Sequence, residues 1–117
     1  MAAYFRTSKS AELLKKFDAR IAQTDQKGRI TTWEKRNDGY YTHKASDWAK
    51  KAFLKASVED EQLRFNIIRP ENKNIDVEVY GYYHGHLIET FLNHFDNDFT
   101  WGSASALPSS GDDVRGA

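Results

Sequence analysis

The stretch AFLKASVEDEQLRFNII, residues 52–68, decides the fold of this 117-residue chain. Its second half alternates apolar with polar side chains: Leu63, Phe65 and Ile67 against Arg64 and Asn66. Alternation with a period of two is typical of a half-buried β-strand. Residues 46–57 fit either an amphipathic helix or one face of a strand. We choose the strand, because an alternating segment follows after only a short acidic connection.

The neighbouring segments extend this pair into a sheet. Residues 30–44 are rich in Thr and aromatic residues around Asn37-Asp38-Gly39, which predicts a hairpin. After the break at Pro70, the alternating residues 75–79 predict another half-buried strand. We therefore expect an antiparallel sheet of about five strands within residues 29–80.

Helical spacing flanks the predicted sheet on both sides. Apolar residues three and four apart predict a first helix, capped by Ser8 or Ser10: Leu13, Leu14, Phe17 and Ile21. The same spacing predicts a second helix after Gly81: Leu87, Ile88, Phe91, Leu92 and Phe95. Both apolar stripes need a surface to cover, so the fold class is α+β, in the order α-β-β-β-β-β-α with both helices on one sheet face.

The organisation along the chain follows from composition. Residues 1–102 are expected to form a single domain, and residues 103–117 a disordered tail with little to bury. Phe99 and Trp101 fit either a short final strand or a cover over the core. There is no apolar run of about 18 residues, which excludes a membrane partner. The chain has no Cys, so we expect a cytoplasmic protein, as a monomer or as a homodimer paired through a sheet edge.

Charge is distributed unevenly. Residues 1–57 hold 13 Lys and Arg against 6 Asp and Glu, or +7, and residues 58–117 hold 4 against 11, or −7. A basic half can mark a surface for a polyanion or an acidic protein. The halves can also fold together so that their charges intermix as a mixed-sign surface, which is the interpretation we favour.

The histidines form the one grouping that resembles a chemical site. His84-Gly85-His86 lies at the predicted strand-to-helix junction, with Glu89 and His94 following. If both were helical, His86 and His94 would be about 12 Å apart along the axis, too far to share one metal ion. We therefore expect no metal, no cofactor and no catalytic residue, and keep a small metal-dependent enzyme centred on His84-Gly85-His86 as an alternative.

Aromatic and charged side chains favour a recognition surface. A sheet covered by helices on one face leaves the other free. The expected function is a non-enzymatic binding or adaptor protein that engages a protein partner. An alternative is a nucleic-acid-binding domain that uses the basic, aromatic-rich residues 33–55. The candidate binding residues are Trp33, Lys35, Tyr41, Trp48, Tyr82, Tyr83, His84 and His86.

Overall fold

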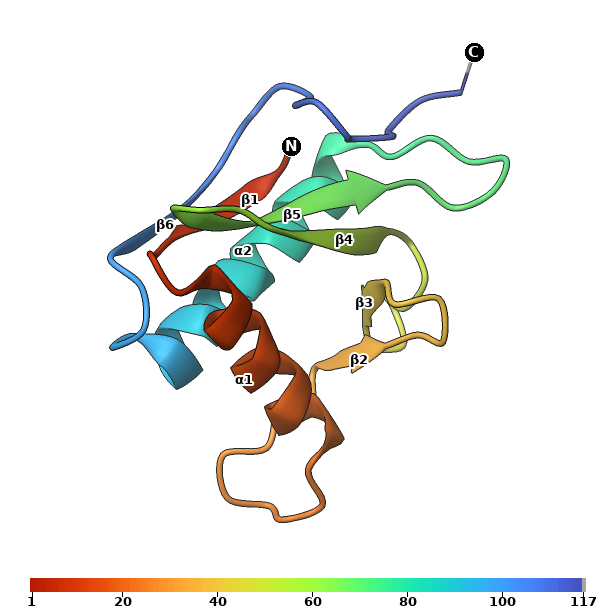
Figure 1. The fold of residues 1–117 in the computed structure, drawn as a ribbon. Helices are drawn as coiled ribbons and strands as arrows, with labels where there is room; N and C mark the ends of the chain where they lie inside the picture. Colours follow the sequence, from red (N-terminus) through yellow and green to blue (C-terminus); the bar gives the residue numbers. More distant parts are fainter. Residues whose placement is uncertain (117) are drawn as a thin grey trace.

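The computed structural model describes residues 1–116 and contains one six-stranded antiparallel sheet in the spatial order β2-β3-β4-β5-β1-β6. Figure 1 shows helices α1 and α2 together on one face of the sheet, which confirms the α+β class. The elements are β1 (Ala3–Arg6), α1 (Ser10–Ala22), β2 (Trp33–Lys35), β3 (Tyr41–His43), β4 (Phe53–Val58), β5 (Gln62–Ile68), α2 (Val77–Phe95) and β6 (Trp101–Ala104).

The order of elements differs from the predicted one at both ends. A strand, β1, precedes α1 and pairs antiparallel with β5, placing Phe5 opposite Leu63. The strand β6 pairs with the other side of β1, and Arg6 lies opposite Trp101. The sequence therefore folds as β-α-β-β-β-β-α-β, and the predicted α-β-β-β-β-β-α order matches only roughly. Of the two possibilities for Phe99 and Trp101, the final strand is the one found.

The first helix lies where apolar spacing predicts it, but its N-terminus differs from the expectation. Leu13 and Phe17 are buried against the sheet. Neither predicted cap is used, because the N-cap position is Lys9 and its side chain makes no cap hydrogen bond. Ser10 is the first helical residue, and its hydroxyl donates to the carbonyl of Glu59 in the β4–β5 turn. That bond ties α1 to the sheet.

The sheet segments 30–44 and 52–68 form strands as expected. β2 and β3 pair through a turn in which Gly39 has a φ of +90°, a conformation that glycine adopts without strain. Six residue pairs join β4 and β5 in antiparallel register. In the ambiguous segment 46–57, the strand begins only at Phe53, and Trp48 lies in the turn before it.

The predicted strand at residues 75–79 is wrong, because this segment contains the start of α2. Asp76 caps the helix, and its Oδ1 accepts a hydrogen bond of 3.1 Å from the backbone N–H of Val79. Glu78 adds a negative charge in the first turn, which favours a helix N-terminus. Gly81, which the sequence suggested as a break, lies inside the helix, where one glycine costs only about 1 kcal/mol.

The core is a cluster of phenylalanine rings between the sheet and the two helices. Phe91 of α2 stacks on Phe5 of β1, with ring centroids 4.1 Å apart. Phe17 of α1 and Phe65 of β5 pack against the same ring at centroid distances of 5.0 and 5.7 Å. One ring therefore joins four elements of the fold.

The C-terminal segment runs alongside the sheet after β6. The carbonyl of Asp113 accepts a 2.7 Å hydrogen bond from the N–H of Arg69, and its own N–H donates to Ile67 at 2.9 Å. Asn66 Nδ2 donates to Asp112 Oδ1 at 2.8 Å. The segment thus lies beside the end of β5 that does not pair with β1. Of the range 103–117 that was expected to be disordered, Ser103 and Ala104 belong to β6 and Ala117 lies outside the described residues; for the others the disorder stays a prediction.

Within residues 1–116, neither helix combines the length and the apolar character that crossing a membrane requires.

Candidate functional site

The eight candidate binding residues divide into a buried and an accessible group. Four have at most 3% of their surface exposed and belong to the interior: Trp33, Tyr41, Tyr83 and His84. Each of them forms a hydrogen bond within the fold. Trp33 Nε1 donates to Thr90 Oγ1 at 3.0 Å, and the Tyr41 hydroxyl donates to Asp18. Burial and this hydrogen bond raise the pKa of Tyr41 well above its usual range. These side chains stabilise the fold and are not available on the surface.

Lys35 is accessible, but it is engaged within the molecule. Its Nζ forms an ion pair of 2.9 Å with Asp18 and lies 5.5 Å from the centroid of the Tyr41 ring. Arg36, the next residue, lies over the ring of Phe53 instead. The basic residues of segment 33–55 are therefore divided between different parts of the surface.

Three candidate residues form one aromatic stack. Trp48 stacks on Tyr82 with centroids 3.9 Å apart and an interplanar angle of 8°, and Tyr82 stacks on His86 at 4.0 Å. His43 of β3 completes the group, 5.4 Å from His86. The sequence could not indicate this contact of His43, because it joins residues 43 positions apart without a shared pattern.

Buried hydroxyl groups stabilise the turn that carries Trp48. The Tyr83 hydroxyl donates to the carbonyl of Trp48 and lies 3.1 Å from the hydroxyl of Thr42. Thr42 Oγ1 in turn accepts from the N–H of Lys50 at 3.0 Å. Lys50 has a φ of +61°, which is strained for a residue with a side chain. These bonds fix the turn in that conformation.

We predict that Tyr83→Phe loosens this turn. The substitution removes the bond from the Tyr83 hydroxyl and leaves the Trp48 carbonyl with only the 3.3 Å bond from the N–H of Lys51, a loss of about 0.5–1.5 kcal/mol. The amide of Lys50 should then exchange with deuterium faster than in the wild-type protein, as measured by NMR or mass spectrometry. Tyr82→Phe is the matched control, because it keeps the stacked ring, and it should leave that exchange rate unchanged. Equal rates in wild type and Tyr83→Phe would contradict the prediction.

Two histidines in this region are buried. Burial, together with the nearby ring of His86, holds the pKa of His43 below its usual value. Its Nδ1 accepts from the N–H of Ala45 at 3.1 Å. Burial also lowers the pKa of His84, whose Nε2 donates to the carbonyl of Met1. Both rings are therefore favoured in their neutral forms.

The structure does not bring His84 and His86 together. Both lie on α2, two positions apart, and side chains with that spacing do not face each other on a helix. His84 is directed to Met1, and His86 packs against Tyr82 and His43. No group of three or more His, Cys, Asp or Glu side chains within residues 1–116 is arranged to hold a metal ion.

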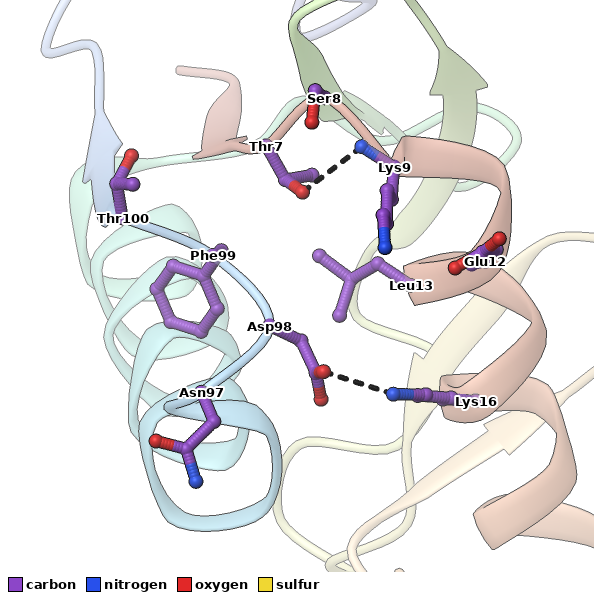
Figure 2. Close-up of a pocket in the computed structure, with 10 residues that line it drawn as sticks. All are labelled: Thr7, Ser8, Lys9, Glu12, Leu13, Lys16, Asn97, Asp98, Phe99 and Thr100. Atoms are coloured by element: carbon purple, nitrogen blue, oxygen red, sulfur yellow. Dashed lines mark hydrogen bonds and ion pairs between the residues drawn. The ribbon is translucent and has the colours of Figure 1, made fainter.

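A hollow of about 320 Å³ lies between the start of α1 and the α2–β6 connection (Figure 2). Some of its polar groups bond to one another. Lys16 Nζ forms an ion pair of 2.8 Å with Asp98, and Thr7 Oγ1 accepts from the N–H of Lys9 at 3.1 Å. None of its lining side chains is among the buried groups without a partner in residues 1–116. We assign no ligand to this hollow.

A second hollow, of about 350 Å³, lies beside Trp48. Lys51 covers the Trp48 ring, with its Nζ 5.4 Å from the ring centroid. The charged residues of the lining are three basic ones and three acidic ones: Lys50, Lys51 and Lys73 against Asp47, Asp76 and Glu78. This balance favours neither an anion nor a cation.

We call the sheet face opposite the helices the outer face; the C-terminal segment covers part of it, where it bonds to Tyr4 and Asn66. Neighbouring residues of a strand face opposite sides of a sheet. Leu54, Leu63 and Phe65 face the helices, so their neighbours form the outer face. Its residues are Tyr4, Arg6, Phe53, Lys55, Ser57, Gln62, Arg64, Asn66, Ile68, Trp101 and Ser103.

Cations dominate the accessible part of the outer face. Arg6 and Arg64 form ion pairs with Glu61 and Glu59, both at 3.4 Å, and these carboxylates come from the β4–β5 turn at the rim. Lys55 lies between them and the Arg36–Phe53 contact, is exposed, and forms no ion pair with any residue of 1–116. In the sequence, the only indication of these cations was the alternation along each strand, which places Lys55, Arg64 and Arg6 on one side of the sheet.

A comparison of this chain with protein-family models, with curated proteins and with solved structures finds no match.

Proposed function

We propose that this chain is a binding protein whose outer face engages an acidic segment of a partner protein. The observation that carries the proposal is the exposed Lys55, unpaired within residues 1–116, at the centre of a sheet face that no helix covers. The proposal agrees with the function expected from the sequence, but it assigns the binding surface to other residues.

The charges of the outer face suit a partner that supplies carboxylates. The ion pair of Arg6 is exposed to water and that of Arg64 is half-buried, and pairs that water reaches contribute only about 0–1 kcal/mol. The guanidinium groups can therefore exchange the carboxylates of Glu59 and Glu61 for those of a partner at little cost. Arginine binds carboxylates in a planar, two-point geometry, which adds specificity to the attraction.

The aromatic residues of this face favour a protein partner over a nucleic acid. Single-stranded nucleic acids are bound by rings on which bases can stack. The Phe53 ring is covered by Arg36 at 4.3 Å, and the Tyr4 hydroxyl donates to Ser109 at 2.8 Å. Only Trp101, at the edge strand, is more than half exposed. A surface with cations at its centre and one free ring at its edge fits an acidic peptide better.

The proposal can be tested by fluorescence anisotropy with a labelled, aspartate- and glutamate-rich peptide. We expect Lys55→Glu combined with Arg64→Glu to weaken binding by about tenfold or more, which is about 1.4 kcal/mol. The matched control is Lys15→Glu, because Lys15 is an exposed lysine on α1, outside the outer face. That variant should bind the peptide like the wild type.

A labelled single-stranded oligonucleotide is the second probe in the same titration. Equal loss of peptide binding in the outer-face and Lys15→Glu variants would contradict the proposal. Tighter binding of the oligonucleotide, falling steeply with salt, would favour the nucleic-acid alternative instead.

A further inference from the structure

The strand β6 has a free edge. It is the last strand in the sheet order, and within the described residues 1–116 only β1 pairs with it. The N–H of Ser105 donates to the carbonyl of Ala2, and hydrogen-bonding direction alternates along an antiparallel strand. Trp101 and Ser103 therefore bond to β1, while Gly102 and Ala104 direct their N–H and C=O groups outward. An edge of this kind is a template for another strand.

The free edge is uncharged, in contrast to the opposite edge of the sheet. β6 reads Trp-Gly-Ser-Ala, whereas the edge strand β2 carries Glu34 and Lys35. Charged side chains on an edge strand discourage pairing with a second copy. In a two-fold arrangement each residue near the axis meets its own copy, so a charge there would repel itself. β6 carries no such obstacle.

The helix next to this edge, α2, also has an outward side that no helix or strand in the described part of the chain covers. Gly81, Gly85, Ile88 and Leu92 of α2 follow each other at spacings of three and four residues, and Leu92 is 52% exposed. A groove of about 300 Å³ separates this side of α2 from residues 104–106, directly after β6. His84 lines the groove and is 3% exposed, and its Nδ1 is buried without a partner in residues 1–116.

We propose that a second copy of this chain covers both features at once. The two β6 strands pair antiparallel about a two-fold axis at Ser103. Gly102 of one copy then lies opposite Ala104 of the other, and the outward groups of both strands form four backbone hydrogen bonds. Corresponding side chains of the two copies then lie on the same side, so the two sheets form one continuous sheet.

The same axis brings the two α2 helices together. α2 contacts both β1 and β6, so it lies beneath the last two strands. Strands are spaced by about 4.8 Å, which places the two helix axes about 10 Å apart across the dyad. Packed helices have this separation. The small residues Gly81 and Gly85, which leave open space where a Cβ would be, allow a close approach.

The area available suits a weak dimer. A helix of 19 residues is about 28 Å long. A strip of that length and about 20 Å wide, a helix diameter plus two strand spacings, has an area of about 560 Å² per copy. The total of about 1,100 Å² only just exceeds what a specific interface needs. We therefore expect association at micromolar concentrations, without dependence on the outer-face partner proposed above.

Sedimentation equilibrium over a range of concentrations tests the proposal. The mass should rise from 13.5 kDa towards twice that value. Ala104→Pro removes an outward N–H while it leaves the bonds to β1 intact, and Ser103→Lys places two ammonium groups at the axis. Both variants should remain monomeric, with circular dichroism spectra like that of the wild type. The matched control, Ser46→Lys in an exposed turn, should still dimerise.

A third variant distinguishes loss of the dimer from misfolding of the monomer. Leu92→Lys changes an exposed side chain of α2 that the monomer does not need, and it too should abolish the dimer. A wild-type mass of 13.5 kDa up to millimolar concentration would overturn the proposal and leave this surface to a different protein. A dimer that persists in the Ala104→Pro, Ser103→Lys and Leu92→Lys variants would overturn it as well.

Discussion

Phe91→Ala should lower the free energy of unfolding by about 3–5 kcal/mol, the usual cost of removing a fully buried aromatic ring. The Phe91 ring is 0% exposed and packs against Phe5, Phe17 and Phe65. These rings come from β1, α1 and β5, so no single neighbour can move to fill the cavity without disturbing another element. Since domains of this size are stable by about 5–15 kcal/mol, the variant should be close to unfolding at room temperature.

Urea denaturation followed by circular dichroism measures this effect. Leu107→Ala is the control, because it also removes a large apolar side chain, but from a position that is 77% exposed. Its unfolding free energy should stay within about 0.5 kcal/mol of the wild-type value. If Phe91→Ala unfolds at the same urea concentration as the wild type, Phe91 does not occupy the centre of the core.

Local patterns predicted most of the fold, and non-local contacts account for what they missed. Alternation found β4 and β5, and helical spacing found the apolar face of α1, because each pattern lies within one element. β1 has only four residues, too few for a period to be recognised. The alternation at 75–79 predicts a strand, whereas the structure starts α2 there with Asp76 as its cap, because so short a pattern fits both structures.

The candidate site was harder to predict, because composition does not show which aromatic side chains are buried. Trp33 and Tyr83 were plausible surface residues by type, yet both fill the core. The stack of Trp48 on Tyr82 joins residues 34 positions apart, a contact that no local pattern indicates. The cations of the outer face could be inferred only after the strand register placed Arg6 beside Gln62 and Ser57 beside Arg64.

The stability of the protein should decrease as the pH falls below about 6.5. Burial lowers the pKa values of His43 and His84, and His94 is shifted in the same direction by burial and by Arg20. The unfolded chain therefore binds more protons than the folded protein in this range, and stability rises with pH wherever that holds. This contribution to stability is fully present above about pH 6.5, the pKa of a histidine in the unfolded chain. It is lost progressively as the pH falls towards the lower pKa values of the histidines in the folded protein. Each histidine contributes at most about 1.4 kcal/mol per pH unit.

Urea midpoints measured between pH 5 and pH 8 test this expectation. The wild-type curve should be flat above pH 7 and fall below it. The double variant His43→Gln with His84→Gln cannot take up these protons, since an amide does not titrate, and it should show a smaller slope between pH 6.5 and 5. The glutamine amide can still donate to the Met1 carbonyl, as the Nε2 of His84 does. Equal slopes in the two proteins would mean that both imidazoles are protonated as easily in the folded protein as in the unfolded chain, and would contradict their burial as neutral rings.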